Sequence, residues 1–171
     1  MKRLLLIDKQ NYDGSWPEIL RTAVRCIIFT GDRLLVIEDK FGEVKLPGGG
    51  QEKGEDDMQT LVREVREETG YPVIPESVRP FGYIEEKRRS FDEEKIWHQI
   101  SRLYFCDIGG DRTGESYTGN EQKLGMRFRT YTLAEAIEMN RKMLDIKGEQ
   151  AWNRREYETL LLIKEHLEKD R

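Results

Sequence analysis

The stretch LPGGGQEKGEDDMQTLVREVREETGY, from Leu46 to Tyr71, contains both a glycine-rich loop and an unusually acidic segment. Three glycines follow Pro47, and a backbone without side chains can come close to a ligand. Three carboxylates then fall within five residues, at Glu64, Glu67 and Glu68. The first question is whether the loop and the carboxylates belong to one site.

The acidic segment has the pattern of an amphipathic helix. Asp56 is suited to cap its start, with Gln59 three residues on in a capping-box arrangement. Gly70 stands where a left-handed residue often ends a helix, and Pro72 prevents continuation. We therefore predict a helix from about Asp57 to Thr69. Its apolar stripe, at spacings of three and four residues, consists of Met58, Leu61, Val62 and Val65.

The three glutamates share one face of this helix. On a helical wheel they lie within an arc of about 100°, roughly 120° away from the apolar stripe. Like charges three and four positions apart repel each other, and Arg63 is the basic residue at the edge of the arc. A bound cation would relieve the repulsion, and oxygen-rich sites of this kind suit Mg²⁺ or Mn²⁺. The alternative interpretation is an acidic helix face that contacts only solvent.

The spacing of the whole stretch resembles the signature box of the Nudix hydrolases. Gly49 is followed by five residues and then Glu55, and seven further residues lead to the run REVREETG that begins at Arg63. All the fixed positions of the box match. Tyr71 departs from the pattern because the family usually has an aliphatic residue there. The resemblance implies the α/β/α sandwich of that family, with a mixed β-sheet.

The resemblance also assigns roles to residues. It implies that Glu64, Glu67 and Glu68 bind the divalent metal together with the carbonyl oxygen of Gly48. Glu55 and Arg63 would pair and hold the loop against the helix. The general base would be either a box glutamate or a residue of a later loop. Glu121 is the candidate there, also as a metal ligand, and the alternative for it is a solvated loop carboxylate. Glu115 is a weaker candidate in the same loop.

Substrate contacts are expected from the glycine loop and from two side chains outside the box. The backbone of Gly48, Gly49 and Gly50 can approach a diphosphate closely. Arg88 could offer charge to a phosphate, and Trp97 could stack on a base. The alternatives are an exposed basic loop around Arg88 and ordinary packing on the sheet for Trp97.

The rest of the chain alternates between strand-like and helical segments, so we expect one mixed α/β domain over residues 1–171. Two further helices are predicted, at about 132–144 and 149–170, the last with a stripe formed by Trp152, Leu160, Ile163 and Leu167. The capping-box pair of the first of these is Thr132 and Glu135. The segment at 109–122 reads as a long polar loop. Strands are expected at about 2–8, 21–29, 33–39, 43–47, 77–86, 97–108 and 123–131.

Composition limits the possible partners and the compartment. The net charge of −4 gives no electrostatic footprint for nucleic acid, and no polybasic run suggests a membrane surface. The first residues form too short an apolar run for a signal peptide, so we expect a cytoplasmic protein. Cys26 and Cys106 both lie in apolar, strand-like runs and are interpreted as buried free thiols rather than as a disulfide or a catalytic pair.

The resemblance implies a metal-dependent hydrolase that cleaves a phosphoanhydride bond in a nucleotide-type diphosphate. The cofactor would be Mg²⁺ or Mn²⁺, and a homodimer is a minority option. The rival from another class is a non-catalytic nucleotide-sugar sensor on the same fold, and such relatives often lose box glutamates. A third option, an isoprenoid diphosphate isomerase, would have a modified box. The subfamily marks outside the box do not point to one substrate. We expect a structural role for His98 and a surface position for His166.

Overall fold

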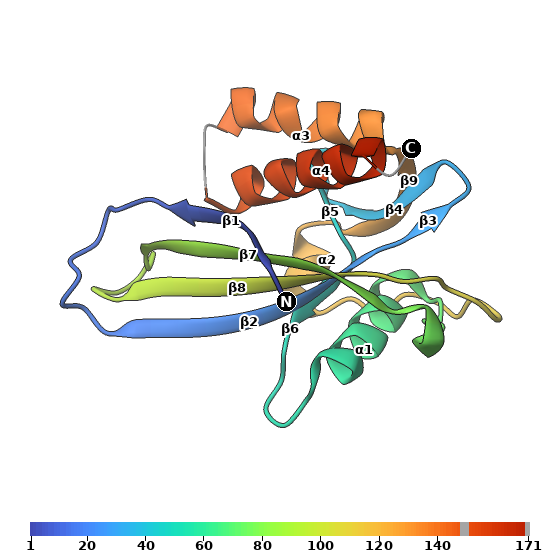
Figure 1. Ribbon diagram of the computed structural model, residues 1–171, viewed down its shortest axis with the longest axis horizontal. Helices are drawn as coiled ribbons and strands as arrows, with labels where there is room; N and C mark the ends of the chain where they lie inside the picture. Colours follow the sequence, from blue (N-terminus) through green and yellow to red (C-terminus); the bar gives the residue numbers. More distant parts are fainter. Residues whose placement is uncertain (148–150, 170–171) are drawn as a thin grey trace.

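The structure, a computed structural model, describes residues 1–147 and 151–169. Its larger sheet has the strand order β1-β7-β8-β2-β6, with parallel pairing of β1 with β7 and of β2 with β8, and antiparallel pairing elsewhere. The mixed sheet and the flanking helices confirm the expected α/β/α sandwich (Figure 1). The strands span Arg3–Asp8 (β1), Arg79–Arg89 (β7), Ile96–Phe105 (β8), Glu18–Ile27 (β2) and Gly48–Gly50 (β6).

A smaller sheet lies in the right-hand part of the molecule in Figure 1. In it β4 pairs with β3, β5 and β9, and all three pairings are antiparallel. Helix α1 lies on one side of the larger sheet, whereas α3 and α4 lie together on the other side (Figure 1). The strands span Phe29–Thr30 (β3), Arg33–Glu38 (β4), Val44–Lys45 (β5) and Arg127–Thr132 (β9). The longer helices span Asp57–Thr69 (α1), Leu133–Lys147 (α3) and Ala151–Lys169 (α4).

Two short helical segments were not predicted. A 3₁₀ turn covers Pro75–Ser77, and helix α2 covers Gly119–Lys123 inside the segment expected to be a polar loop. The cause of α2 is local, because Thr118 and Glu121 form a capping box at its start. This turn holds Glu121 in a defined position.

Helix α1 begins and ends where the sequence predicts. The Asp56 carboxylate accepts the backbone N–H of Gln59 at 2.8 Å, and the Gln59 side chain accepts the N–H of Asp56 at 2.9 Å. Gly70 has φ 75° and donates its N–H to the Arg66 carbonyl. The apolar stripe is narrower than predicted, because Met58 and Val62 remain 37% and 36% exposed at the outer edge of the helix.

Strand β2 supplies side chains to both sides of the larger sheet, and two hydrophobic clusters result. The cluster on the α1 side fixes that helix to the sheet through Leu61 and Val65, which are almost fully buried. The cluster on the other side includes Leu160 and Ile163 of α4, as the predicted stripe requires, while the Trp152 side chain lies outside the described part. Since α1 is clamped along its apolar side, the position of its carboxylates is set by the core.

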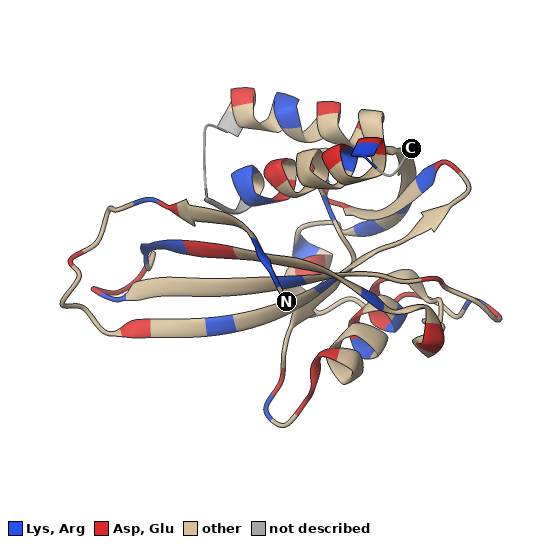
Figure 2. Ribbon diagram, viewed as in Figure 1, with Lys and Arg blue, Asp and Glu red and all other residues tan. Residues whose placement is uncertain are grey.

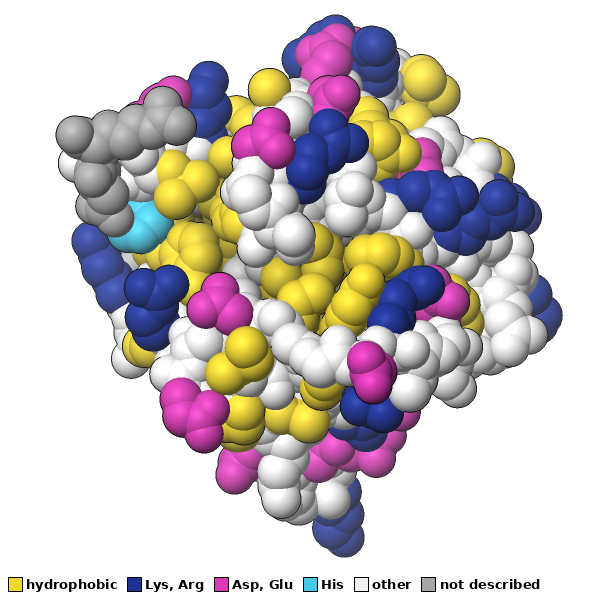
Figure 3. Space-filling view, turned by 90° about the vertical axis from the view of Figure 1, so that its right-hand side faces the viewer, with side chains coloured by type: hydrophobic (Ala, Val, Ile, Leu, Met, Phe, Trp, Pro, Cys, Tyr) yellow, Lys and Arg dark blue, Asp and Glu magenta, His cyan; other side chains and the backbone are white. Residues whose placement is uncertain are grey.

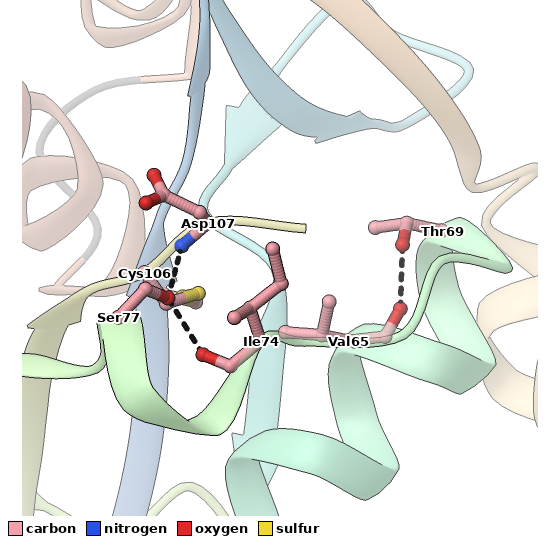
Figure 4. The surroundings of a disulfide bond; sticks show 7 residues. Val65, Thr69, Ile74, Ser77, Cys106 and Asp107 are labelled. Carbon is pink, nitrogen blue, oxygen red and sulfur yellow. Dashed lines mark hydrogen bonds between the residues drawn. A yellow bond between two sulfur atoms is a disulfide. The ribbon is translucent and has the colours of Figure 1, made fainter. Parts of the chain in front are cut away.

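The prediction of two free thiols is wrong, because Cys26 and Cys106 form a disulfide. Cys26 lies in β2 beside Tyr104 of β8, and Cys106 follows the end of β8, so parallel pairing brings them to a Cα–Cα distance of 6.4 Å. Figure 4 shows the neighbourhood, where the Ser77 hydroxyl accepts the N–H of Asp107 at 2.7 Å and donates to the Ile74 carbonyl.

We expect this disulfide to contribute measurably to stability. It closes a loop with a sequence separation of 80 residues, and cross-links of this kind typically contribute about 2–4 kcal/mol to the free energy of unfolding. Urea unfolding with and without a reductant should therefore differ by that amount. A Cys106→Ala variant is the control, because its stability should not respond to the reductant. Equal stability of the oxidised and reduced wild type would contradict the prediction.

Acidic and basic residues are mixed along the described part of the chain (Figure 2). Figure 3 shows an end face where hydrophobic side chains gather in the middle and charged ones at the margin. Among the described helices, none is long and apolar enough to cross a membrane. His166, which was expected to be superficial, packs against the rings of Phe81 and Phe105 at 5.1 and 5.6 Å between ring centres. Function must therefore be sought in local clusters of polar groups.

Candidate active site

The glycine stretch forms an edge strand that has room for no side chain. Strand β6 pairs with β2 so that Gly48 lies beside Arg25 and Gly50 beside Ala23. A β-carbon on Gly48, which has φ 132°, would overlap the carbonyl oxygen of Val24. A β-carbon on Gly49 would overlap the carboxylate of Glu64. The bare backbone therefore lets the Glu64 carboxylate of α1 lie directly on the strand.

Glu68 is the most deeply buried of the three glutamates, with 1% of its surface exposed. One carboxylate oxygen accepts the backbone N–H of Gly48 at 2.6 Å, and the other accepts the Lys45 ammonium at 2.7 Å. Burial raises the pKa of Glu68, and the charges of Lys45 and Arg25 oppose that rise. The carboxylate is thus joined to the glycine strand on one side and to a cation on the other.

Arg63 connects the loop, the helix and the glycine strand. Its guanidinium makes a two-pronged ion pair with Glu55, at 2.6 and 2.8 Å, and donates to the Gly50 carbonyl at 3.1 Å. The same group lies 2.8 Å from Glu64 and 3.4 Å from Glu67. The hydrogen bond from Arg63 and that from the Glu52 backbone lower the pKa of Glu55 to about 2. Glu55 and Arg63 are therefore placed to order the groups around them.

Of the two loop candidates, the structure brings only Glu121 to the glutamates of α1. One Glu121 oxygen accepts hydrogen bonds from Thr118, and the other lies 3.7 Å from the Lys45 nitrogen. Burial alone would raise the pKa of Glu121, but the Thr118 hydrogen bonds and the charge of Lys45 lower it overall. Glu115 pairs instead with Arg112. Lys45 thus joins Glu68 and Glu121 across the end of the glycine strand.

The carboxylate and carbonyl oxygens of this cluster are suitable ligands for a hard divalent cation, although in this structure they contact basic side chains of the protein. Among the described residues, no three acidic, histidine or cysteine side chains converge on one point. Instead, Lys45 lies between Glu68 and Glu121, and Arg63 contacts both Glu64 and Glu67. The Gly48 carbonyl accepts a hydrogen bond from Arg25. Carboxylate and carbonyl oxygens are the ligands that Mg²⁺ and Mn²⁺ prefer, and the basic groups mark where positive charge is favoured.

Arg88 and Trp97 do not contact this cluster. They pair across β7 and β8, and the Arg88 guanidinium lies 5.2 Å from the Trp97 ring. Trp97 is level with Ile19 of β2, whereas Gly50 is level with Ala23, so about 13 Å of strand separates the two rows. His98 is held between Glu18 and Glu85 at 2.9 and 3.0 Å, in keeping with a structural role.

Sequence reasoning missed the three basic residues closest to the glycine strand. Lys45 stands two positions before Pro47, and Arg21 and Arg25 interrupt an otherwise apolar strand at an even spacing. Residues two or four apart on a strand face the same side, so two arginines in a buried strand were a detectable signal of a polar site. Their contact with the box could not be seen without the pairing of β2 with β6.

Comparison with known families identifies this arrangement. The family model described as the NUDIX domain matches residues 19–149, which include the glycine strand, α1 and Glu121. The chain belongs to the Nudix family. No curated protein sequence matches the chain at a significant level.

Solved Nudix structures share the fold at low sequence identity. The MutT protein of Bacillus halodurans is 24% identical, with 70% of this chain and 72% of that chain covered and a TM-score of 0.53. A protein described as an ADP compounds hydrolase is 21% identical, with 88% and 74% covered and a TM-score of 0.53. A UDP-X diphosphatase is 15% identical, with 90% and 65% covered and a TM-score of 0.58. The expected enzyme class, a Nudix-type pyrophosphohydrolase, is thereby confirmed.

Proposed function

We propose that this Nudix protein is a divalent-metal-dependent hydrolase of a phosphoanhydride bond in a nucleoside diphosphate linked to a further group. The observation that carries the proposal is the convergence of Glu68 and Glu121 on one cationic group beside the side-chain-free strand β6. The nucleotide part of the substrate is supported by the similar fold of proteins described as acting on ADP compounds and UDP-X.

The carboxylates of α1 and the Gly48 carbonyl would hold the metal, with Glu121 as a further ligand or as the base. Bound Mg²⁺ or Mn²⁺ supplies charge neutralisation of the diphosphate and a lowered pKa of an attacking water. Lys45 and Arg25 must then release Glu68 and the Gly48 carbonyl, which they contact in this structure. Glu67, with a side chain 41% exposed, and Glu121 are the carboxylates open enough to take the proton of the water.

The test of this proposal is a substrate screen with purified protein and Mg²⁺. The panel consists of nucleoside triphosphates, dinucleotides, ADP-ribose and nucleotide sugars. We expect turnover of at least one member. For a dinucleotide, ADP-ribose or a nucleotide sugar the products are phosphomonoesters, so inorganic phosphate should be released only after a phosphatase is added. Tight binding of a nucleotide sugar without turnover of any member would instead favour a sensor.

A Gly49→Ala substitution should lower activity more than stability. The added β-carbon would overlap the Glu64 carboxylate, which lies at the end of a flexible side chain and can move away. Displacement of a candidate ligand by about 1 Å should reduce kcat/KM roughly a hundredfold, while the midpoint of thermal unfolding changes little. Gly14→Ala is the matched control, because no atom lies within 4 Å of its β-carbon. Unchanged kcat/KM in Gly49→Ala would argue against a role for Glu64.

A further inference from the structure

Two arginines of β2 face the α4 side of the sheet next to the glycine strand. Arg21 and Arg25 are four residues apart on β2, so they share the face of Ile27, which packs in the hydrophobic cluster with Leu160 and Ile163 of α4. Arg25 is 8% exposed, and Arg21 is half-buried. Burying two like charges side by side is unfavourable unless something of opposite sign compensates them.

Arg21 has little compensation from the protein. Its guanidinium donates to the neutral side chain of Gln99 at 3.0 Å, and among the described residues no carboxylate forms an ion pair with it. Burial lowers the pKa of Arg21, and the charges of Arg25 and Arg155 lower it further, against the opposing charges of Glu64 and Glu86. Most of its N–H donors are therefore available to another acceptor.

Arg25 reinforces this local excess of positive charge. It donates to the carbonyl oxygens of Leu46 and Gly48, and its Nε atom is buried without a hydrogen-bond partner. Arg155, by contrast, is neutralised by Glu86 at 2.6 Å and by Glu156 at 2.9 Å. Within the described residues neither Arg21 nor Arg25 forms such an ion pair. The charges of Glu64 and Glu86 reach Arg21, and that of Arg25 reaches Glu68, only without a direct contact.

The glycine strand places Arg21 and Glu64 on either side of a backbone that carries no side chains. Strand β6 is the last strand of the larger sheet, and Gly50 has no side chain to screen the Arg21 guanidinium, since a β-carbon there would lie 2.9 Å from its Nη2 atom. Groups from the two faces of the sheet therefore meet across this edge. An anion that lies along β6 could reach the site formed by the glutamates of α1 with one end and contact Arg21 with the other.

We propose that Arg21 binds the phosphate oxygens of the substrate from the α4 side of β6, whereas the carboxylates of α1 lie on the other side. Arg25 adds positive charge next to Arg21. The planar guanidinium suits this task because it can donate two parallel hydrogen bonds to a phosphate. The identity of the anion as a nucleoside diphosphate rests on the proposed function. The anion-binding role of Arg21 rests on its own surroundings.

The test measures binding of α,β-methylene-ADP, a non-hydrolysable nucleoside diphosphate, by calorimetry in EDTA and again with Mg²⁺. We expect Arg21→Met to weaken binding about ten- to hundredfold in both conditions, because hydrogen bonds between two charged groups are lost. Arg21→Lys should restore part of the affinity. Arg79→Met is the matched control, since Arg79 is an exposed arginine at the start of β7, and it should bind like the wild type.

Two further measurements separate this inference from the proposed function and from misfolding. The affinity of the nucleotide-free protein for Mn²⁺ should be the same in Arg21→Met and in the wild type. Arg21→Gln provides a second neutral variant should Arg21→Met fail to fold. Equal binding of the analogue by a folded neutral variant and the wild type would overturn the assignment, as would no binding by the wild type. Binding in EDTA that depends on Arg21, without Mn²⁺ uptake or hydrolysis, would overturn only the metal-dependent function.

Discussion

Replacing Glu68 with glutamine should abolish turnover while leaving the fold intact. Glutamine has nearly the same shape and can still accept the N–H of Gly48, but it has no charge with which to bind a metal. Because several kcal/mol of transition-state stabilisation would be lost with the metal, we expect kcat/KM to fall at least about a thousandfold. The measurement is hydrolysis of the best substrate from the panel, with circular dichroism to verify the fold.

The substitution also breaks the ion pair of Glu68 with Lys45, so stability is measured beside activity. The single oxygen of glutamine cannot accept from both the Gly48 N–H and the Lys45 ammonium, and we expect the free energy of unfolding to fall by about 1–3 kcal/mol. Glu165→Gln is the matched control, because Glu165 is an exposed glutamate of α4 that pairs with Lys169. Activity of Glu68→Gln within tenfold of the wild type would refute its assignment as a ligand.

The largest loss of stability is expected from Glu86→Ala. Glu86 is 1% exposed and accepts hydrogen bonds from Arg155 of α4 at 2.6 Å and from Arg88 at 3.1 Å. Its removal leaves Arg155, itself 7% exposed, with Glu156 alone as a partner. Breaking a buried pair in this way typically costs about 3–5 kcal/mol, and urea unfolding measures it.

An exposed pair provides the comparison for Glu86. Glu165 and Lys169 are 58% and 69% exposed at the side chain, so Glu165→Ala should cost less than about 1 kcal/mol. Should both substitutions have equally small effects, the ion pair between the larger sheet and α4 would not be what holds that helix in place.

The parts of the site that were predictable depend on residues close in sequence. The caps of α1, its glutamate face and the pair of Glu55 with Arg63 all lie within one stretch of the chain, where helical spacing is enough to place them. The prediction for Glu121 needed the family resemblance, because only tertiary packing brings α2 to Lys45.

The parts that were missed depend on strand register and packing. The disulfide requires that β2 and β8 run side by side, which no local pattern of Cys26 or Cys106 reveals. The basic residues Arg21 and Arg25 acquire their meaning from the pairing of β2 with β6. The exposure of Met58 similarly depends on how far the sheet extends beneath α1, and helical periodicity does not contain that information.

The most direct test of the account is a calorimetric titration of the protein with Mn²⁺ in the presence of α,β-methylene-ADP. If the carboxylates of α1 bind the metal, the wild type should take up Mn²⁺, and Glu64→Gln and Glu68→Gln should each weaken that uptake at least about tenfold. No uptake by the wild type, or uptake that both substitutions leave unchanged, would contradict the assignment of this site as the metal centre of a hydrolase.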